Sequence, residues 1–396
     1  MNPSVLLYVQ HLLGIGHLER ALRLARALSR EGMRVTLVCG GKGLASREKI
    51  AAERVVQLPP IKAGDSSFRT LIDGRGERVG EALCAERRTA LLAAYRQARP
   101  EALILESFPF GRRAFRFELD PLIAAARAQN PRPLLFSSIR DILVAPQSEE
   151  KSREITARVR EEFDAVLVHA DPSLVTLERS FPAAREIADR LYYTGYIGRE
   201  ELPPNSPLGA GEVVVSAGGG AVGGPLLRAA LEARRKGCLS GVPWRLFAGA
   251  NLPLEEYAAL QPGLQKGVVL ERHREDFADR LFACRVSVSQ AGYNTMLDIL
   301  AARARAVVVP FASGREIEQT LRAEIFASLG LVEVVAEKDL TPERLGAAIA
   351  RAALRPQMDL AIATDGALKS AEIVARMLAL RSRQFRSAAS EAIMPQ

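Results

Sequence analysis

The chain has 396 residues, of which 48% are hydrophobic and 25% charged, a balance typical of a globular protein and a length sufficient for two cores. Its formal charge is +8, but arginine is spread along the whole chain and aromatic residues make up only 6%, so a nucleic-acid partner is not expected. The four cysteines and four histidines lack the spacing of CxxC or HExxH motifs, so neither a disulfide framework nor a bound metal is predicted.

The N-terminal segment predicts the location of the protein. It lacks the basic region and cleavage site of a secretory signal, and no apolar run approaches the roughly 18 residues of a membrane helix. A cytoplasmic protein is therefore expected. Because the net charge is positive, peripheral contact with anionic lipid on the inner face of the membrane stays open.

The first segment predicts a βαβ unit. Residues 4–10 form an apolar run typical of a buried strand, and residues 18–30 carry apolar side chains at helical spacing. A glycine loop lies between them. Gly32 is a helix stop signal, and residues 34–39 form a second apolar run. A strand, a helix and a strand in this order predict a parallel sheet.

The pattern continues through the first half. A helix is expected over residues 81–97, and further strands are expected over residues 54–58, 102–105, 133–137 and 165–168. Residues 61–76 form a polar segment too long for an ordinary connection, which favours a functional loop. The first half is therefore expected to be a Rossmann-like acceptor domain over residues 1–197.

Proline and turn residues over 192–207 predict a linker, after which the architecture repeats. A helix is expected to start at Thr341, because Pro342 follows this capping residue. Strands of the second half are expected over residues 212–216, 244–248, 267–270, 286–289, 306–309 and 331–335. The fold class is α/β, with two Rossmann-like domains whose parallel sheets face across a cleft. The second domain is expected over residues 198–375, followed by a tail over 376–396 that packs back or is disordered.

Each half has a glycine-rich turn between a strand and a helix. Helix N-termini offer free backbone N–H groups and a partial positive charge, which suit a diphosphate. Neither turn has the Gly-Lys-Ser/Thr of a Walker A motif. Neither has a complete GxGxxG fingerprint with its acidic residue about 20 positions later. ATP hydrolysis and nicotinamide binding are therefore disfavoured.

Three segments together resemble the GT-B glycosyltransferases, namely residues 14–20, 216–220 and 287–298. A fourth segment, residues 309–323, resembles the donor-binding loop and helix of the family 28-like enzymes that add N-acetylglucosamine to the lipid-linked peptidoglycan precursor. The resemblance spans both halves of the chain. Its motifs are specific for the fold and the donor class, and they say little about the acceptor.

The resemblance implies that the second half holds a nucleotide-sugar donor and that no cofactor beyond this co-substrate is needed. Asp298 takes the place of an acidic residue that accepts hydrogen bonds from the ribose hydroxyls of UDP. Glu318 and Gln319 correspond to a pair that contacts the hydroxyls of the donor sugar. The other donor-side residues would bring backbone and small polar groups to the phosphates, and they are Ser216, Gly218, Gly219, Gly220, Gly292, Tyr293, Asn294 and Thr295. The family usually has glutamate in place of Asp298 and glutamine in place of Glu318, which leaves the identity of the sugar open.

The resemblance also implies that His17 is the catalytic base. Imidazole suits proton transfer near neutral pH. Glu106, which follows the strand over residues 102–105, is expected to face the same site and to fix the tautomer of His17. The structural alternatives are a local helix cap for His17 and a solvated carboxylate for Glu106. His11 is an alternative base, and His169 is expected to be a hydrogen-bonded loop residue.

The predicted acceptor side lies at the same edge of the first sheet. Arg140 and Asp141 follow another strand of this sheet, and ligands gather beyond the carboxyl ends of parallel strands. The complete set of predicted acceptor-side residues is Gly14, Gly16, His11, Arg140 and Asp141. Arg112 and Arg113 would suit a phosphate, but a structural or exposed role is favoured for both.

These features predict an inverting, metal-independent hexosyltransferase that uses a UDP-sugar and acts on an unidentified acceptor, either lipid-linked or a small metabolite. A nucleotide-sugar 2-epimerase or hydrolase of the same fold is the first alternative, which the small number of histidines disfavours. A catalytically silent binding subunit is the second alternative.

Overall fold

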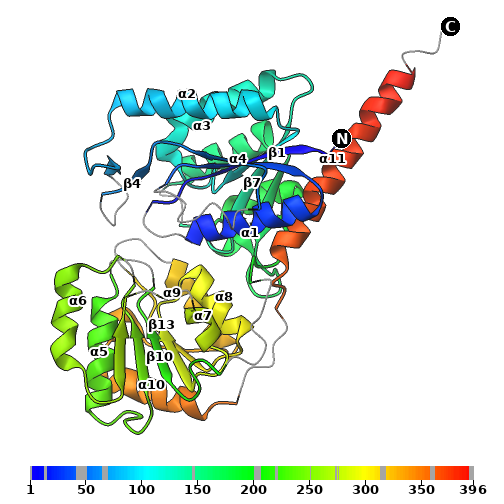
Figure 1. Cartoon of the computed structure of the whole chain (residues 1–396). Coiled ribbons are helices and arrows are strands. Elements are labelled where there is room, and N and C mark those ends of the chain that lie inside the picture. Colours follow the sequence, from blue (N-terminus) through cyan, green and yellow to red (C-terminus); the bar gives the residue numbers. More distant parts are fainter. Residues whose placement is uncertain are drawn as a thin grey trace. The chain divides into compact units, whose positions relative to one another are not determined.

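The structure of the chain is a computed structural model (Figure 1). It describes residues 2–12, 16–41, 51–64, 70–144, 148–199, 207–218, 222–249, 251–272, 274, 276–312, 318–356 and 362–391. The chain forms two compact units. Unit 1 comprises Met1–Ile197 and Asp365–Gln396, and unit 2 comprises Gly198–Thr364.

Unit 1 is built on a seven-stranded sheet in the order β3-β2-β1-β6-β7-β8-β9, in which every neighbouring pair is parallel. Its strands are β1 (Ser4–Val9), β2 (Arg34–Cys39), β3 (Arg54–Gln57), β6 (Ala102–Glu106), β7 (Leu134–Arg140), β8 (Ala165–His169) and β9 (Leu191–Tyr193). Its helices are α1 (Gly16–Arg30), α2 (Glu81–Ala98), α3 (Arg116–Ala128), α4 (Glu149–Glu162) and α11 (Gly366–Glu391), with 3₁₀ turns at Arg113–Phe115, Leu177–Arg179 and Pro182–Arg190.

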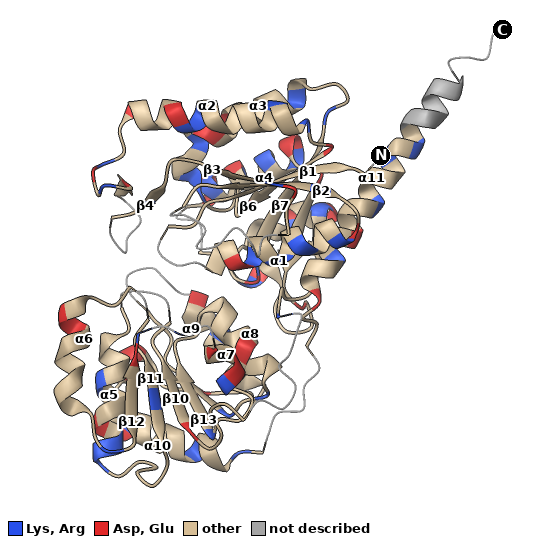
Figure 2. Cartoon of the chain, in the orientation of Figure 1, with Lys and Arg blue, Asp and Glu red and all other residues tan. Residues whose placement is uncertain are grey.

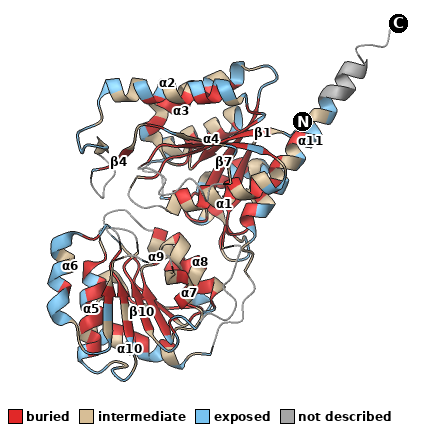
Figure 3. Cartoon of the chain, in the orientation of Figure 1, coloured by how far each residue is buried: buried red, intermediate tan, exposed pale blue. Residues whose placement is uncertain are grey.

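Helices cover both faces of this sheet because its central strands are apolar on both sides. All six residues of β1 are buried. Val5, Leu7 and Val9 pack in one core with α1 and α11, whereas Leu6 and Tyr8 pack in a second core with α2 and α3. Alternation of side chains along a strand produces this division. Figure 3 shows the resulting pattern of buried strands under helices whose outer faces are exposed.

Helix α1 ends as the sequence predicts. Gly32 has a φ of +78°, the left-handed conformation in which a side chain is strained. Its N–H donates to Ser29 O at 3.0 Å, and Met33 N–H donates to Leu28 O at 3.1 Å, which is the Schellman arrangement. The predicted stop at Gly32 is confirmed.

The expected long polar loop contains secondary structure. Strands β4 (Ile61–Ala63) and β5 (Leu71–Asp73) form an antiparallel pair within it. Residues 65–69 of the same segment lie outside the described residues.

Unit 2 repeats the doubly wound plan with a six-stranded parallel sheet in the order β12-β11-β10-β13-β14-β15. Its strands are β10 (Val213–Ser216), β11 (Trp244–Phe247), β12 (Val268–Glu271), β13 (Val286–Ser289), β14 (Ala306–Val308) and β15 (Glu333–Val334). Its helices are α5 (Gly224–Arg235), α6 (Leu254–Leu260), α7 (Phe277–Arg280), α8 (Tyr293–Ala301), α9 (Glu318–Ser328) and α10 (Pro342–Leu354), with 3₁₀ turns at Gln261–Gly263 and Glu337–Asp339. Thr341 Oγ1 accepts a hydrogen bond from Arg344 N–H, so the predicted cap of α10 is confirmed.

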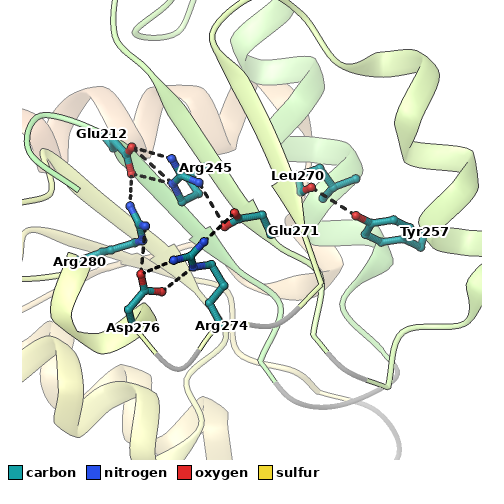
Figure 4. Close-up of polar contacts among 8 residues, drawn as sticks. All are labelled: Glu212, Arg245, Tyr257, Leu270, Glu271, Arg274, Asp276 and Arg280. Atoms are coloured by element: carbon teal, nitrogen blue, oxygen red, sulfur yellow. Dashed lines mark hydrogen bonds and ion pairs between the residues drawn. The ribbon is translucent and has the colours of Figure 1, made fainter. Parts of the chain in front are cut away.

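A closed circuit of ion pairs stabilises one face of this second sheet (Figure 4). Three arginines alternate with three carboxylates, in the order Glu212, Arg245, Glu271, Arg274, Asp276 and Arg280. Trp244 and Leu246 point into the apolar core, so Arg245 between them points to the opposite face. The circuit connects Glu212, just before β10, with β11, β12 and the segment that carries α7. In Figure 2 both charge signs are likewise interspersed over each unit.

The boundary of the second domain differs from the prediction. The first boundary, after Ile197, is where the sequence places it, but unit 2 ends at Thr364 and not at residue 375. The apolar stripe Ala367, Ala371, Val374 and Leu378 runs through residue 375 without a break and packs in the core that contains α1. Gly366 N–H donates to Tyr196 O at 2.9 Å, which fastens the start of α11 to unit 1.

Three smaller differences concern strand ends. β7 extends through Arg140 and β8 through His169, so both residues belong to strands. The expected linker begins with β9, because Leu191–Tyr193 pairs with β8.

None of the described helices combines the length and the apolar character that crossing a membrane requires.

Candidate functional site

In unit 1 the topological switch point lies between β1 and β6, since the later strands β2 and β3 are added on one side of β1 and β6 to β9 on the other. Open parallel sheets bind ligands beyond the carboxyl ends of their strands at such a point. His17 is the second residue of α1, the helix that follows β1, and Glu106 is the last residue of β6. The fold therefore places both residues at this switch point.

His17, Glu106 and Arg20 converge on one oxygen atom. His17 Nδ1 lies 2.7 Å from Glu106 Oε1. Arg20 Nη2 donates to the same oxygen and lies 3.2 Å from His17 Nδ1. The His17 side chain is 20% exposed, whereas those of Arg20 and Glu106 are 3% and 1% exposed. The imidazole thus forms the accessible edge of a cluster that is otherwise buried.

The charges of this cluster favour a neutral imidazole beside an ionised carboxylate. Burial lowers the pKa of His17, Glu106 raises it, and Arg112 and Arg20 lower it again, with a net result below the ordinary 6.5. Burial opposes ionisation of Glu106, but His17 and Arg20 outweigh that effect and lower the pKa of this carboxyl below its usual range. A carboxylate that accepts Nδ1–H leaves Nε2 as the basic atom.

Arg112 completes the positive surroundings of the carboxylate. It interacts electrostatically with Glu106 and Arg140, and its Nε–H donates to Gln10 O at 2.7 Å. Its φ of 58° is left-handed, an uncommon conformation for a residue with a side chain. Backbone strain of this kind persists where surrounding contacts hold it, and here the contact with Gln10 does so.

The remaining acceptor-side residues occupy different environments. His11 is buried at the end of β1, with its Nδ1 4.0 Å from Cys39 Sγ. Asp141 is also buried, and Arg140 is half-buried at the end of β7. Gly16 begins α1, and Gly14 lies outside the described residues.

His169 is a satisfied core residue of β8 and not the loop residue that the sequence suggests. Its Nε2 lies 2.8 Å from Ser138 Oγ and its Nδ1 lies 2.9 Å from Thr194 Oγ1. Burial lowers the pKa of His169 to about 3. It is therefore a buried, neutral histidine.

In unit 2 the corresponding switch point lies between β10 and β13. Ser216 and Ser289 are the last residues of these strands and are paired in register. Ser216 Oγ accepts a hydrogen bond from Gly218 N–H at 3.2 Å, and Gly218 has a φ of +71°. The turn after β10 therefore requires glycine at this position. Gly219 and Gly220 lie outside the described residues.

Helix α8 begins at the same edge of the sheet. Gly292 precedes it, and a Cβ at this position would meet no atom within 4 Å. Asn294, Thr295 and Asp298 are half-buried, and Asp298 shares a helix face with each of the other two, because it follows Asn294 by four residues and Thr295 by three. Tyr293 is buried, so it offers its backbone and not its ring to this face.

Glu318 and Gln319 make internal contacts at the start of α9. Glu318 is buried and accepts a hydrogen bond from Arg322 Nη2 at 2.8 Å. Arg322 Nη1 donates to Ala291 O at 3.0 Å, and its guanidinium lies over the Tyr293 ring at 5.6 Å. Gln319 Oε1 accepts a hydrogen bond from Phe311 N–H at 3.0 Å. Glu318 thus supports the turn before α8 through Arg322, and the direct contact of both residues with a sugar stays a prediction.

Sequence reasoning assigned no role to two arginines of these sites, Arg20 and Arg322, and it favoured a structural or exposed role for Arg112. Arg20 carries a detectable signal, because it occupies the apolar face of α1 three residues after His17. Arg112 and Arg322 are brought to their sites by tertiary contacts. Among the described residues no three His, Cys, Asp or Glu side chains gather as metal ligands would, and the absence of a metal requirement stays a prediction.

Two units with parallel, doubly wound sheets define the GT-B class of fold, and solved structures share it over nearly the whole chain. The glycotransferase of kitacinnamycin aligns with a TM-score of 0.62 at 18% identity and covers 97% of this chain and 100% of its own. MurG of Acinetobacter baumannii aligns with a TM-score of 0.57 at 16% identity and covers 94% of this chain and 100% of its own.

Sequence comparison finds similarity to one family in part of the chain. Residues 257–377 match the glycosyltransferase family 28 C-terminal domain. A curated relative from Geobacillus thermodenitrificans (strain NG80-2) is 28% identical over 183 residues, which are 43% of this chain and 50% of the relative. It is named UDP-N-acetylglucosamine--N-acetylmuramyl-(pentapeptide) pyrophosphoryl-undecaprenol N-acetylglucosamine transferase. The match thus spans about half the length of this relative. The chain therefore has the fold of the GT-B glycosyltransferases, and residues 257–377 are similar to the family 28 C-terminal domain.

Proposed function

We propose that the protein is an inverting, metal-independent hexosyltransferase that moves the sugar of a UDP-sugar to the hydroxyl of an acceptor. The observation that carries the proposal is the contact of 2.7 Å between His17 Nδ1 and Glu106 Oε1 at the switch point of unit 1. The family 28 domain and relatives whose names specify a UDP-sugar support the donor class.

His17 acts as the base in this reaction. Its Nε2 takes the proton of the acceptor hydroxyl while that oxygen bonds to the anomeric carbon of the donor sugar. The bond from the anomeric carbon to the β-phosphate oxygen breaks, and UDP leaves with the electron pair. Attack from the side opposite the leaving group inverts the anomeric centre. Glu106 stabilises the imidazolium that forms, because its carboxylate accepts Nδ1–H.

Unit 2 binds the donor in this proposal. The backbone N–H groups of the first turn of α8 face the diphosphate and stabilise its charge as it leaves. Asp298 accepts hydrogen bonds from the ribose hydroxyls. The partial positive charge of a helix N-terminus takes the place of a metal ion at the leaving group.

The acceptor is assigned only by class. Arg112 and Arg140 suit an acceptor that carries phosphate, as a lipid-linked sugar does, and a small-molecule acceptor is the alternative. Action on a lipid-linked acceptor would place a cytoplasmic protein at the inner face of the membrane, where its net positive charge of +8 favours anionic lipid.

Donor binding and turnover test the proposal. Thermal shift with UDP, GDP, dTDP and ADP, and with the matching sugars, should show stabilisation by uridine ligands above the others. Asp298→Asn should weaken UDP binding, whereas Asp339→Asn, in a 3₁₀ turn of the same unit, serves as the control. UDP release that needs an acceptor supports transfer. UDP release without an acceptor would indicate the hydrolase, and stabilisation by none of the nucleotides would contradict the donor assignment.

A further inference from the structure

Among the described residues of unit 1, two buried arginine–glutamate pairs differ in geometry. Arg87 grips Glu118 with two atoms, since Nε donates to Oε2 at 2.9 Å and Nη2 donates to Oε1 at 2.6 Å. Arg20 donates from Nη2 to Glu106 Oε1, the oxygen that His17 also contacts. Glu106 Oε2 is buried and has no partner among the described residues.

Stability alone does not account for the second geometry. An unpaired buried carboxylate oxygen is unfavourable, and a two-pronged contact like that of Arg87 would satisfy both oxygens. Arg20 instead shares Oε1 with the imidazole. Arg20 Nη2 and His17 Nδ1 lie 3.2 Å apart, and both face the same acceptor, Glu106 Oε1.

This arrangement determines which nitrogen of His17 carries the proton. If Nδ1 were unprotonated, its lone pair would face a carboxylate oxygen at 2.7 Å. That contact is repulsive, whereas Nδ1–H donating to the carboxylate is a charge-assisted hydrogen bond. We propose that Arg20 is a positioning residue that holds Glu106 as the acceptor of His17 Nδ1–H and thereby keeps Nε2 of His17 as the basic atom. The inference deepens the proposed function, on which it rests.

Arg20 also lowers the pKa of the His17 imidazole. Its positive charge offsets that of Glu106, which otherwise favours protonation of His17. The other charged or titratable groups around the cluster are Arg112, after β6, Arg140, at the end of β7, and His169, at the end of β8. Removing Arg20 takes away a cation and leaves Glu106 uncompensated. Both changes raise the pKa of His17.

Nuclear magnetic resonance of the imidazole nitrogens tests the inference on the full chain without donor or acceptor. The chain has only four histidines, so single His→Gln variants assign each signal. At pH 7 we expect His17 with Nδ1 protonated and Nε2 unprotonated. In Arg20→Gln we expect the pKa of His17 to rise by about one unit or more. Arg26→Gln removes the same charge from α1 outside the cluster, and it should leave the titration unchanged.

Two results would overturn the inference. One is a wild-type His17 that carries its proton on Nε2, a measurement that needs no substitution of Arg20. The other is a folded Arg20→Gln protein in which the pKa of His17 is unchanged or lower. If the titration is as expected but no sugar transfer is found, the proposed function fails and the role of Arg20 stands. If transfer is found but the titration is not as expected, this inference alone fails.

Discussion

Arg87 and Glu118 form an ion pair in which both side chains are completely buried. Tyr8 OH donates to Glu118 Oε1 at 2.6 Å, and Arg87 Nη2 donates to Gln10 Oε1 at 2.8 Å. Gln10 in turn accepts from Arg112 through its backbone oxygen. The pair therefore connects helices α2 and α3 to the end of β1, where the candidate site begins.

Glu118→Ala should strongly destabilise unit 1. The substitution leaves the Arg87 guanidinium buried without its carboxylate, a change that costs about 3–5 kcal/mol in comparable cases. Chemical denaturation measures the effect. The double variant Arg87→Met, Glu118→Leu removes both charges and should recover part of the loss, because the Tyr8 hydroxyl and the Gln10 amide still lose their partners. A single variant within about 0.5 kcal/mol of the wild type would refute a structural role for the pair.

Gly366→Ala should weaken the packing of the start of α11 against the rest of unit 1. A Cβ at this position would lie 2.2 Å from Gly195 O, a backbone atom that cannot move away cheaply. We expect a loss of about 1–3 kcal/mol in the free energy of unfolding. Gly241→Ala is the matched control, because its Cβ would meet no atom within 4 Å. Equal stability of the two variants would argue against this packing of α11.

His169 should make the stability of the protein depend on pH. Burial lowers its pKa to about 3, whereas an unfolded imidazole titrates near 6.5. Between these values the unfolded state binds more protons, so the free energy of unfolding falls with falling pH by up to about 1.4 kcal/mol per pH unit from this group. The slope should be shallower in His169→Gln. Identical slopes below pH 6 would contradict a buried, neutral His169.

Arg322→Lys should weaken donor binding without unfolding unit 2. Lysine cannot at once pair with Glu318, reach Ala291 O and cover the Tyr293 ring as the guanidinium does. We expect the Kd for UDP to rise about tenfold, measured by calorimetry, because the turn before α8 is less well held. Arg351→Lys alters an exposed pair with Glu333 and should not change the Kd. An unchanged Kd in Arg322→Lys would separate this arginine from the donor site.

The fold was largely predictable because its signals are local. Apolar runs such as residues 34–39 and stop signals such as Gly32 coincide with the observed elements. The extent of α11 was not predictable in this way. Its apolar stripe at Ala367, Ala371 and Val374 indicates that one face of the helix is buried. Only the tertiary structure shows that this face packs against α1.

The site was predictable to the level of residue type and strand end. The order of the strands brings Glu106 beside His17, and the rule for parallel sheets anticipates this proximity. The position of Arg20 on the apolar face of α1 is visible in the sequence, but its contact with Glu106 is not, because tertiary packing sets the approach of α1 to the end of β6. The internal pairing of Glu318 depends on Arg322 and Ala291, whose approach is set by packing.

The turnover and UDP affinity of His17→Ala test the central claim most directly. With Glu106 and the donor site intact, loss of the base should lower kcat by about 10²–10⁴ while the Kd for UDP stays the same. His169→Gln is the matched control, because both ring nitrogens of this buried histidine already contact Ser138 and Thr194. A His17→Ala protein that retains wild-type turnover, or that loses turnover only together with UDP binding, would contradict the assignment of His17 as the base.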